Sequence, residues 1–254
     1  MTYYYDLTKD ERRVSIFKEA ITKKANGITY DLGTGSGILA SFASPHAKKV
    51  YAFEINPLVI KRYSKELLDN YDNVELIEAD LTSYDYIEKP DVVICEMLDT
   101  ALIDEEQVPV INNVLNYAKE NTIFIPKSTY DTIQLGYSEI FHITYKEDED
   151  IPFKSLSNEV KYNTVDFSKK TNPNFEKDIK MTIEKSGEIN TLLITTYTYV
   201  TEELITGPTP MLNPPLLIPV NNLKVSQGNT IIINLKYVMG GGLNTIKANI
   251  RKVI

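Results

Sequence analysis

The pattern of apolar and polar positions divides the chain into two parts with different periods. In the first half, segments with helical spacing alternate with short apolar runs, which is typical of a mostly parallel sheet with helices on both faces. Strands are expected in GITYDLG, KKVYAFEIN, NVELIEAD, DVVICEM and NTIFIPK. The uninterrupted apolar run in DVVICEM predicts a strand that is buried on both faces.

Helices are expected before and between these strands. The segment at residues 10–25 places Val14, Phe17, Ala20 and Ile21 on one face of a helix. SGILASFAS predicts a second helix, and PLVIKRYSKELLDNY predicts a third, which opens with a proline at a favourable first position.

From about Pro126 onward the period changes to two, and helical spacing nearly disappears. Alternating stretches separated by Gly, Pro and Asn turns predict antiparallel strands in STYDTIQLGY, TLLITTYTYVTEE, PPLLIPV and NTIIINLKYVM. The polar, irregular stretch at residues 145–177 is interpreted as a surface excursion. We therefore predict an α/β Rossmann-like domain over residues 1–125 and an antiparallel β-barrel-like domain over residues 126–254.

Composition narrows the class of protein. The 254 residues carry a formal net charge of -8, which argues against a nucleic-acid partner, because such proteins concentrate positive charge against phosphate. No apolar run approaches the roughly 18 residues needed to span a bilayer, and the N-terminus lacks the apolar core of a signal peptide. We expect a soluble, cytoplasmic protein with no membrane partner.

The cysteine and histidine content bears on metal binding. The single cysteine, Cys95, is expected to be a small buried residue. His142 alternates with apolar neighbours and is expected to be an ordinary strand residue. Because the two histidines, His46 and His142, lie far apart in the chain, no convincing metal cluster can be assembled and no metal is expected.

The stretch YDLGTGSGIL follows the first expected strand and leads into a helix. A glycine-rich turn at such a place lets a ligand approach backbone N–H groups, and the helix N-terminus adds positive potential, so nucleotides are the obvious ligands. Gly33, Gly35 and Gly37 have the spacing G-x-G-x-G, which lacks the third glycine of the dinucleotide-binding fingerprint. An acidic residue, Asp31, precedes them instead.

Asp31, Glu54 near the end of the second strand and Asp80 near the end of the third together resemble the S-adenosylmethionine site of class I methyltransferases. In that family the first acid helps to hold the methionine end of the cofactor, the second takes the ribose hydroxyls and the third faces the adenine. A carboxylate suits vicinal hydroxyls because it can accept both. The resemblance implies S-adenosylmethionine as cofactor, S-adenosylhomocysteine as product, and binding by Asp31, Gly33, Gly35, Gly37, Glu54 and Asp80.

The segment CEMLDTALIDEEQ follows the fourth strand and carries Glu96 and Glu105 in the pattern E-M-L-x(6)-E. It looks like the double-glutamate loop of protein arginine methyltransferases, with the same separation between the acids. KDERRVSIFKEAI is similar to that family's N-terminal helix, whose arginine, matched by Arg13, meets the cofactor carboxylate. NTIFIPKSTYD and ITGPTPM resemble the approaches to the family's barrel and to its substrate-side loop. The resemblance covers nearly the whole chain, strongly in residues 9–135 and loosely beyond.

The paired carboxylates have a chemical reason. A guanidinium stays protonated and presents five donors in a planar fork, so two acids can hold it and draw its charge to one side, leaving the opposite nitrogen to attack. Glu96 and Glu105 are therefore the candidate catalytic residues, and Glu96 and Arg13 are also expected at the cofactor. A cationic protein substrate agrees with the acidic charge. Alternatively, Glu105 only caps or solvates the following helix.

The chain departs from the family at several places. Asp99–Thr100 replaces Gly-Tyr inside the loop and adds a third carboxylate, and Asn213–Pro214–Pro215 stands where the family has Thr-His-Trp. There is no tryptophan at all. The polar excursion is too short for the family's dimerisation arm, so the oligomeric state stays open. TYYYD, residues 2–6, can supply aromatic walls over the cofactor or serve only in surface packing.

Two other functions stay open on this sequence. One is an RNA or small-molecule methyltransferase that kept the fold and replaced the acceptor loop. The missing Thr-His-Trp supports it, whereas the lack of an Asn/Asp-Pro-Pro-Tyr motif after the fourth strand argues against base N-methylation. The other is a cofactor-binding subunit that no longer catalyses.

Overall fold

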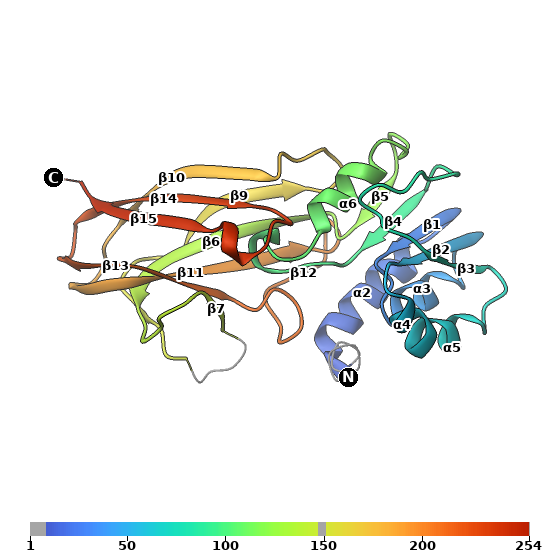
Figure 1. Cartoon of the computed structure of the whole chain (residues 1–254), viewed down its shortest axis with the longest axis horizontal. Coiled ribbons are helices and arrows are strands. Elements are labelled where there is room, and N and C mark those ends of the chain that lie inside the picture. Colours follow the sequence, from blue (N-terminus) through green and yellow to red (C-terminus); the bar gives the residue numbers. More distant parts are fainter. Residues whose placement is uncertain (1–8, 147–150, 254) are drawn as a thin grey trace.

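The N-terminal part is built on a parallel sheet with the strand order β3-β2-β1-β4-β5. The computed structural model describes residues 9–146 and 151–253 (Figure 1). Its five strands fall in the five segments that the sequence predicts. They are β1 (Ile28–Leu32), β2 (Lys49–Glu54), β3 (Val74–Glu78), β4 (Val92–Cys95) and β5 (Ile123–Ile125).

Helical segments flank this sheet. They are α2 (Glu11–Lys24), α3 (Ile38–Ala43), α4 (Pro57–Val59), the π-helical η1 (Ile60–Ser64), α5 (Lys65–Leu68), the 3₁₀ turn η2 (Thr100–Leu102) and α6 (Gln107–Val114). Phe17, Ala20 and Ile21 form the buried face of α2 as expected, but Val14 is only partly buried. Arg13 takes the inward position instead, because it finds a buried acidic partner.

The strand order brings the candidate residues to one edge of the sheet. In a parallel sheet all carboxyl ends lie on the same edge, and a crevice forms between β1 and β4, where the chain reverses its direction of winding. The glycine turn follows β1, Glu54 ends β2, and Glu96 directly follows β4. Asp80 lies two residues beyond the end of β3.

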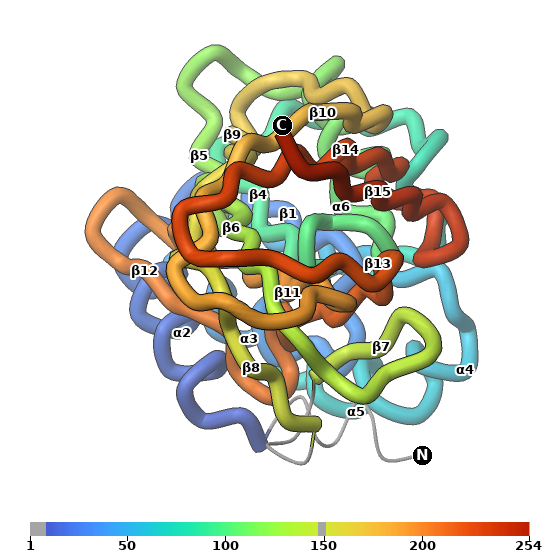
Figure 2. The backbone as a smooth tube through the Cα atoms, turned by 90° about the vertical axis from the view of Figure 1, so that its left-hand side faces the viewer, coloured from blue at the N-terminus to red at the C-terminus, as the bar shows by residue number. Residues whose placement is uncertain are grey.

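The second part is antiparallel and forms the other end of the elongated molecule (Figures 1 and 2). One sheet has the path β7-β13-β11-β6-β8, with β12 added to β11 and β9 to β6; the other is β10-β14-β15. The longer strands are β6 (Ser128–Tyr137), β9 (Val160–Asp166), β10 (Asn174–Thr182), β11 (Gly187–Tyr199), β13 (Leu216–Val225), β14 (Thr230–Val238) and β15 (Lys247–Lys252). The short elements are β7 (Thr144–Tyr145), β8 (Lys154–Ser155), β12 (Ile205–Thr206) and the 3₁₀ turn η3 (Leu243–Thr245).

Parallel α/β sheet followed by antiparallel β sheets is the predicted fold class, which is confirmed. β5 ends at Ile125 and β6 begins at Ser128. Among the residues that the structure describes, no helix is both long and apolar enough to cross a membrane.

Two local predictions are wrong. The described part of the stretch at residues 145–177 is not irregular, because residues 151–177 contain β8, β9 and the start of β10. The pairing of β9 with β6 slips between Asp131 and Thr132, which leaves Tyr162 as the extra residue of a bulge and breaks the alternation that would have revealed the strand. His142 is exposed in a bend before β7 and is not a strand residue.

A buried acidic residue of the β domain is tied to the loop that follows β4. Asp131 on β6 accepts hydrogen bonds from Thr196 Oγ1 at 2.6 Å and from Asn163 Nδ2 at 3.0 Å. Thr196 Oγ1 in turn accepts the N–H of Ala101 at 2.8 Å. Burial raises the pKa of Asp131 to about 6, against the opposing effect of these donors.

Replacing Asp131 by Asn is expected to change how stability depends on pH. The raised pKa means that the folded state keeps a proton that the unfolded state has lost, so wild-type stability falls as the pH rises from the unfolded pKa towards about 6. The Asn163 amide can flip to pair with the new amide. As the pH rises from the unfolded pKa to about 6, the free energy of unfolding measured with urea should fall by roughly 2–3 kcal/mol more in the wild type than in Asp131→Asn. Parallel pH profiles would contradict the prediction.

Candidate active site

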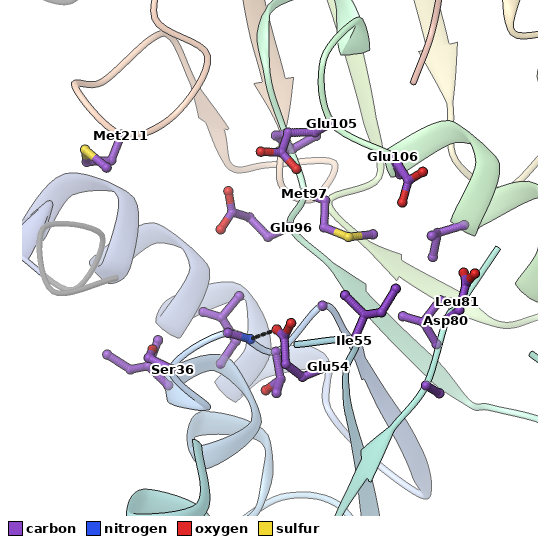
Figure 3. A pocket seen from close by; sticks show the side chains of 18 of the residues that line it. Ser36, Glu54, Ile55, Asp80, Leu81, Glu96, Met97, Glu105, Glu106 and Met211 are labelled. Carbon is purple, nitrogen blue, oxygen red and sulfur yellow. Dashed lines mark hydrogen bonds between the residues drawn. The ribbon is translucent and has the colours of Figure 1, made fainter. Parts of the chain in front are cut away.

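A cavity of about 250 Å³ opens at the carboxyl edge of the parallel sheet, beneath the edge of the β domain (Figure 3). Residues from α2, from the segments after β1, β2, β3 and β4, and from the loop before β13 form its wall. They are Arg13, Gly33, Thr34, Gly35, Ser36, Ile38, Leu39, Glu54, Ile55, Ala79, Asp80, Leu81, Glu96, Met97, Leu98, Glu105, Glu106, Val110 and Met211.

The glycine turn forms one side of this cavity and requires its glycines. Gly33, Gly35 and Gly37 have φ values of 73°, 55° and 85°, in the left-handed region that side chains disfavour. A Cβ on Gly33 would lie 2.7 Å from Met97 Sδ. Gly33 and Gly35 line the cavity, whereas Gly37 is the N-cap of α3 and packs against Leu68.

Asp31 lies in the core next to this turn. It is buried, it accepts a hydrogen bond from Thr34 Oγ1 at 2.5 Å, and burial raises the pKa of its carboxyl to about 7. Among the described residues it does not belong to the cavity wall, although Thr34 does. Asp31 therefore supports the turn from within the core, and a direct contact with the cofactor stays a prediction.

Glu54 and Asp80 lie on the cavity wall beside the glycine turn. Glu54 is buried, and its two carboxylate oxygens accept the N–H groups of Gly35 at 3.0 Å and of Asn56 at 2.9 Å. Asp80 is exposed and accepts the N–H and hydroxyl of Thr82, which lowers the pKa of its carboxyl. Backbone bonds thus hold both acids in place at the cavity.

Glu96 is fixed from two directions. Its Oε2 forms a buried ion pair with Arg13 of α2. The Gln107 side chain donates to the carbonyl of Cys95 at 2.8 Å and accepts the N–H of Met97 at 2.9 Å, and so holds the backbone on both sides of Glu96. Burial raises the pKa of Glu96, and Arg13 opposes that rise. Cys95 is buried, as expected.

Glu105 approaches the same cavity from the other end of the loop. Figure 3 shows the Glu96 and Glu105 side chains near each other, with Glu54 on the opposite side of the view. Partial burial, together with the carboxylates of Asp104, Glu96 and Glu106, raises the pKa of Glu105. Capping by Glu105 is not supported, because Glu106 occupies the N-cap of α6 and no side chain bonds there. Glu105 is exposed, so the alternative that it only solvates the helix start stays open.

The double-glutamate loop, residues 96–105, has an internal anchor. Asp99 is buried, and its carboxylate accepts the N–H groups of Ile103 at 3.0 Å, Asp104 at 2.9 Å and Glu105 at 3.3 Å. Burial raises the pKa of Asp99 to about 7, which these three donors partly offset. The third carboxylate of the loop is not among the described residues of the cavity wall, since this side chain points into its own loop.

The Asn-Pro-Pro segment braces the double-glutamate loop from behind. Asn213 is fully buried and donates from Nδ2 to Thr198 Oγ1 at 2.9 Å. The carbonyl of Pro214 accepts the Thr100 hydroxyl at 2.7 Å. None of residues 213–215 is among the described residues of the cavity wall, so the segment acts on the site through the loop.

Met211 is the part of this region that reaches the cavity, and the sequence did not single it out. It is joined to α2 through Asp10, whose Oδ2 accepts the N–H of Met211 at 3.2 Å and the hydroxyl of Thr209. The other Asp10 oxygen caps α2 by accepting the N–H of Arg13 at 3.1 Å. TYYYD lies outside the described residues.

Comparisons with known proteins agree with this architecture. A family model described as a methyltransferase domain matches residues 30–121. An uncharacterized protein of Methanocaldococcus jannaschii is 44% identical, over 98% of this chain and 96% of that protein. Protein arginine N-methyltransferase 6 of Danio rerio is 28% identical, over 45% of this chain and 34% of that protein.

Similarity to a solved structure extends over the whole chain. The PRMT1 enzyme–prozyme heterotetrameric complex of Trypanosoma brucei with AdoHcy contains a chain that matches with a TM-score of 0.79. The match covers 99% of both chains at 15% sequence identity, and therefore concerns the fold.

Proposed function

Because the chain belongs to the class I S-adenosylmethionine-dependent methyltransferases, we propose that it methylates a guanidinium nitrogen of arginine in a protein substrate. The observation that carries the proposal is the placement of Glu96 and Glu105 on the wall of one cavity together with the glycine turn. Methyl donor and acceptor would then meet between these two sets of residues.

The cavity residues fit S-adenosylmethionine. Gly33 and Gly35 present bare backbone with positive φ on the cavity wall, which lets a ligand approach closely. Glu54 and Asp80 provide carboxylates for hydroxyl and amine donors, and Arg13 provides a cation for the cofactor carboxylate. When bound, the cofactor supplies a methyl group already activated by the sulfonium.

Charge supports a cationic acceptor. Among the described residues that line the cavity, five carboxylates stand against the single guanidinium of Arg13. Glu96 uses Oε2 for Arg13, which leaves Oε1 for an acceptor, and Glu105 presents its carboxylate from the other end of the loop. A planar guanidinium donates in two directions at once and suits such a divided pair better than a point charge does.

The contribution of the protein would be to hold and orient. Two carboxylates on one side of the guanidinium fix its plane and concentrate its positive charge near them, so the far nitrogen is turned towards the methyl group. Gln107 and Arg13 keep Glu96 from turning, and Asp99 keeps the backbone of Glu105 in place. The nitrogen loses its proton after transfer, and either carboxylate is within the same cavity to receive it.

Incubation with S-adenosylmethionine carrying a labelled methyl group, in an extract of the source cells, tests the proposal. We expect label in protease-sensitive material that is released as methylarginine on acid hydrolysis. Label that is lost to ribonuclease, or that is found in small molecules, would overturn the arginine assignment and leave the cofactor assignment intact. Calorimetric binding of the cofactor without transfer to any fraction would indicate a silent binding subunit.

A further inference from the structure

The β14–β15 loop, residues 239–246, lies against the double-glutamate loop although the two are far apart in sequence. We propose that Gly240 and Gly242 are positioning residues that hold the double-glutamate loop, and thereby Glu105, in the geometry that receives the acceptor. The functional half of this inference rests on the proposed function, whereas the structural half does not.

The double-glutamate loop needs an external support. Ala101 and Leu102 both have φ of 58°, a left-handed conformation that is unfavourable for a non-glycine residue. Residues in such a conformation persist only when their surroundings fix them. Both side chains are completely buried, so the support must come from the protein around them.

The β14–β15 loop provides that support through backbone bonds. Gly240 N–H donates to the carbonyl of Leu102, and Gly242 N–H donates to the carbonyl of Ile103, each at 2.9 Å. One carbonyl belongs to the strained Leu102 itself, and the other belongs to the next residue, Ile103. The two bonds therefore fix the loop at the point where it turns towards Glu105.

Close packing explains why glycine is needed at these positions. Gly240 has φ of 76°, and a Cβ there would lie 2.9 Å from Pro109 Cγ and 3.6 Å from the carbonyl oxygen of Glu105. Gly242 has φ of 86°. A side chain at residue 240 would push on Pro109 in the first turn of α6, and it would touch the carbonyl oxygen of Glu105 at an ordinary contact distance.

The β14–β15 loop is itself braced. Thr245 Oγ1 accepts the N–H of Val238 at 3.1 Å and donates to the carbonyl of Gly242 at 2.8 Å. These bonds join the end of β14 to the loop. Thr245 can therefore be altered to loosen the support without adding atoms next to Glu105.

The two glutamates consequently depend on different parts of the molecule. Glu96 is held by Arg13 and Gln107 of the N-terminal part, whereas the backbone before Glu105 is held by the β domain. A change in the β14–β15 loop should move one carboxylate relative to the other. The kcat/KM for the acceptor should therefore fall, while the residues expected to bind the cofactor stay in place.

The test compares Gly240→Ala with Gly228→Ala. Gly228 lies before the other end of β14 with φ of 85°, and a Cβ there meets nothing within 4 Å. Both variants place a side chain at a glycine of positive φ next to β14, but only Gly240→Ala brings the added Cβ against the start of α6, and we expect only it to displace the double-glutamate loop. We expect Gly240→Ala to lower kcat/KM for an arginine peptide about tenfold or more, as small misplacements do. Cofactor affinity should be unchanged, and Gly228→Ala should match the wild type in activity.

A milder pair of variants covers the case in which Gly240→Ala does not fold. Thr245→Val removes the bracing hydroxyl at nearly constant volume, and Thr245→Ser restores it. The valine variant should show a smaller loss for the acceptor, and the serine variant should recover the wild-type value. Equal activity of the valine and serine variants would count against the inference.

Hydrogen exchange separates this inference from the proposed function. Peptides that cover residues 99–106 should exchange faster in Gly240→Ala and Thr245→Val than in the wild type and Gly228→Ala. If the wild type methylates no arginine but this difference is seen, the proposed function fails and the support of the loop stands. Identical exchange in all four proteins overturns the inference.

Discussion

Glu105→Gln should lower kcat for arginine methylation by about 10²–10³ while leaving cofactor affinity unchanged. The substitution keeps the size of the side chain and removes one of the two charges that, in the proposed function, hold and polarise the guanidinium. Losses of that order follow removal of one preorganised electrostatic partner. Glu105 belongs to the acceptor side of the cavity, so cofactor binding should be spared. Steady-state kinetics and calorimetry measure the two effects separately.

Glu106→Gln is the matched control for this substitution. Glu106 is the next residue, lines the same cavity and carries the same charge, so both variants change the cavity charge equally. We expect Glu106→Gln to affect turnover far less. Equal losses would mean that total charge matters and that Glu105 has no particular place in holding the acceptor. Glu96→Gln should resemble Glu105→Gln in turnover.

Arg13→Met should destabilise the folded protein by about 3–5 kcal/mol, the usual result of removing one partner of a buried ion pair. The methionine fills the space, but Glu96 is left in the core without its counter-charge. Cofactor affinity should also fall, because the cation expected at the cofactor carboxylate is gone. Denaturant unfolding and calorimetry measure these two results.

The loss of stability in Arg13→Met should depend on pH. Burial already raises the pKa of Glu96, and Arg13 opposes that rise, so losing Arg13 raises the pKa further. The folded variant then holds a proton that the unfolded chain has lost, and its stability falls as the pH rises through that window. The deficit relative to the wild type should therefore be larger at pH 8 than at pH 5.

The double variant Arg13→Met/Glu96→Gln provides the check. A neutral amide in place of the carboxylate removes the buried charge, so part of the lost stability and most of the added pH dependence should return. If the double variant is no more stable than Arg13→Met at pH 8, the loss arises from packing around α2 and the ion-pair explanation is wrong.

The parallel sheet was predictable because each of its strands can be recognised from its own short segment of sequence. DVVICEM and GITYDLG are short apolar runs bounded by turn residues, and the acids that matter follow directly at the strand ends. Glu54 and Glu96 were assigned to one site through their resemblance to methyltransferase motifs, and the carboxyl ends of such strands lie on one edge of the sheet. β9 was missed because a bulge at Tyr162 removes the alternation on which its prediction depends.

The direction in which a side chain points was the harder part. Asp99 and Glu105 are both acids in one short loop, yet one turns inward to three backbone amides and the other turns to the cavity. The Gln107 side chain bonds to the backbone of Cys95 and Met97 on either side of Glu96. Its sequence neighbours indicate only an ordinary helix start. Such choices depend on donors supplied by the folded backbone, which residue spacing does not reveal.

The inward carboxylate of Asp99 also affects which ligands the backbone of the double-glutamate loop can bind. Exposed amides in tight turns commonly attract phosphate or carboxylate groups. Here the N–H groups of Ile103, Asp104 and Glu105 are already occupied by an anion from the same chain. Asp99 thus satisfies these donors from within the loop, while Glu96 and Glu105 line the cavity. An anionic molecule therefore finds these three amides already bonded to Asp99.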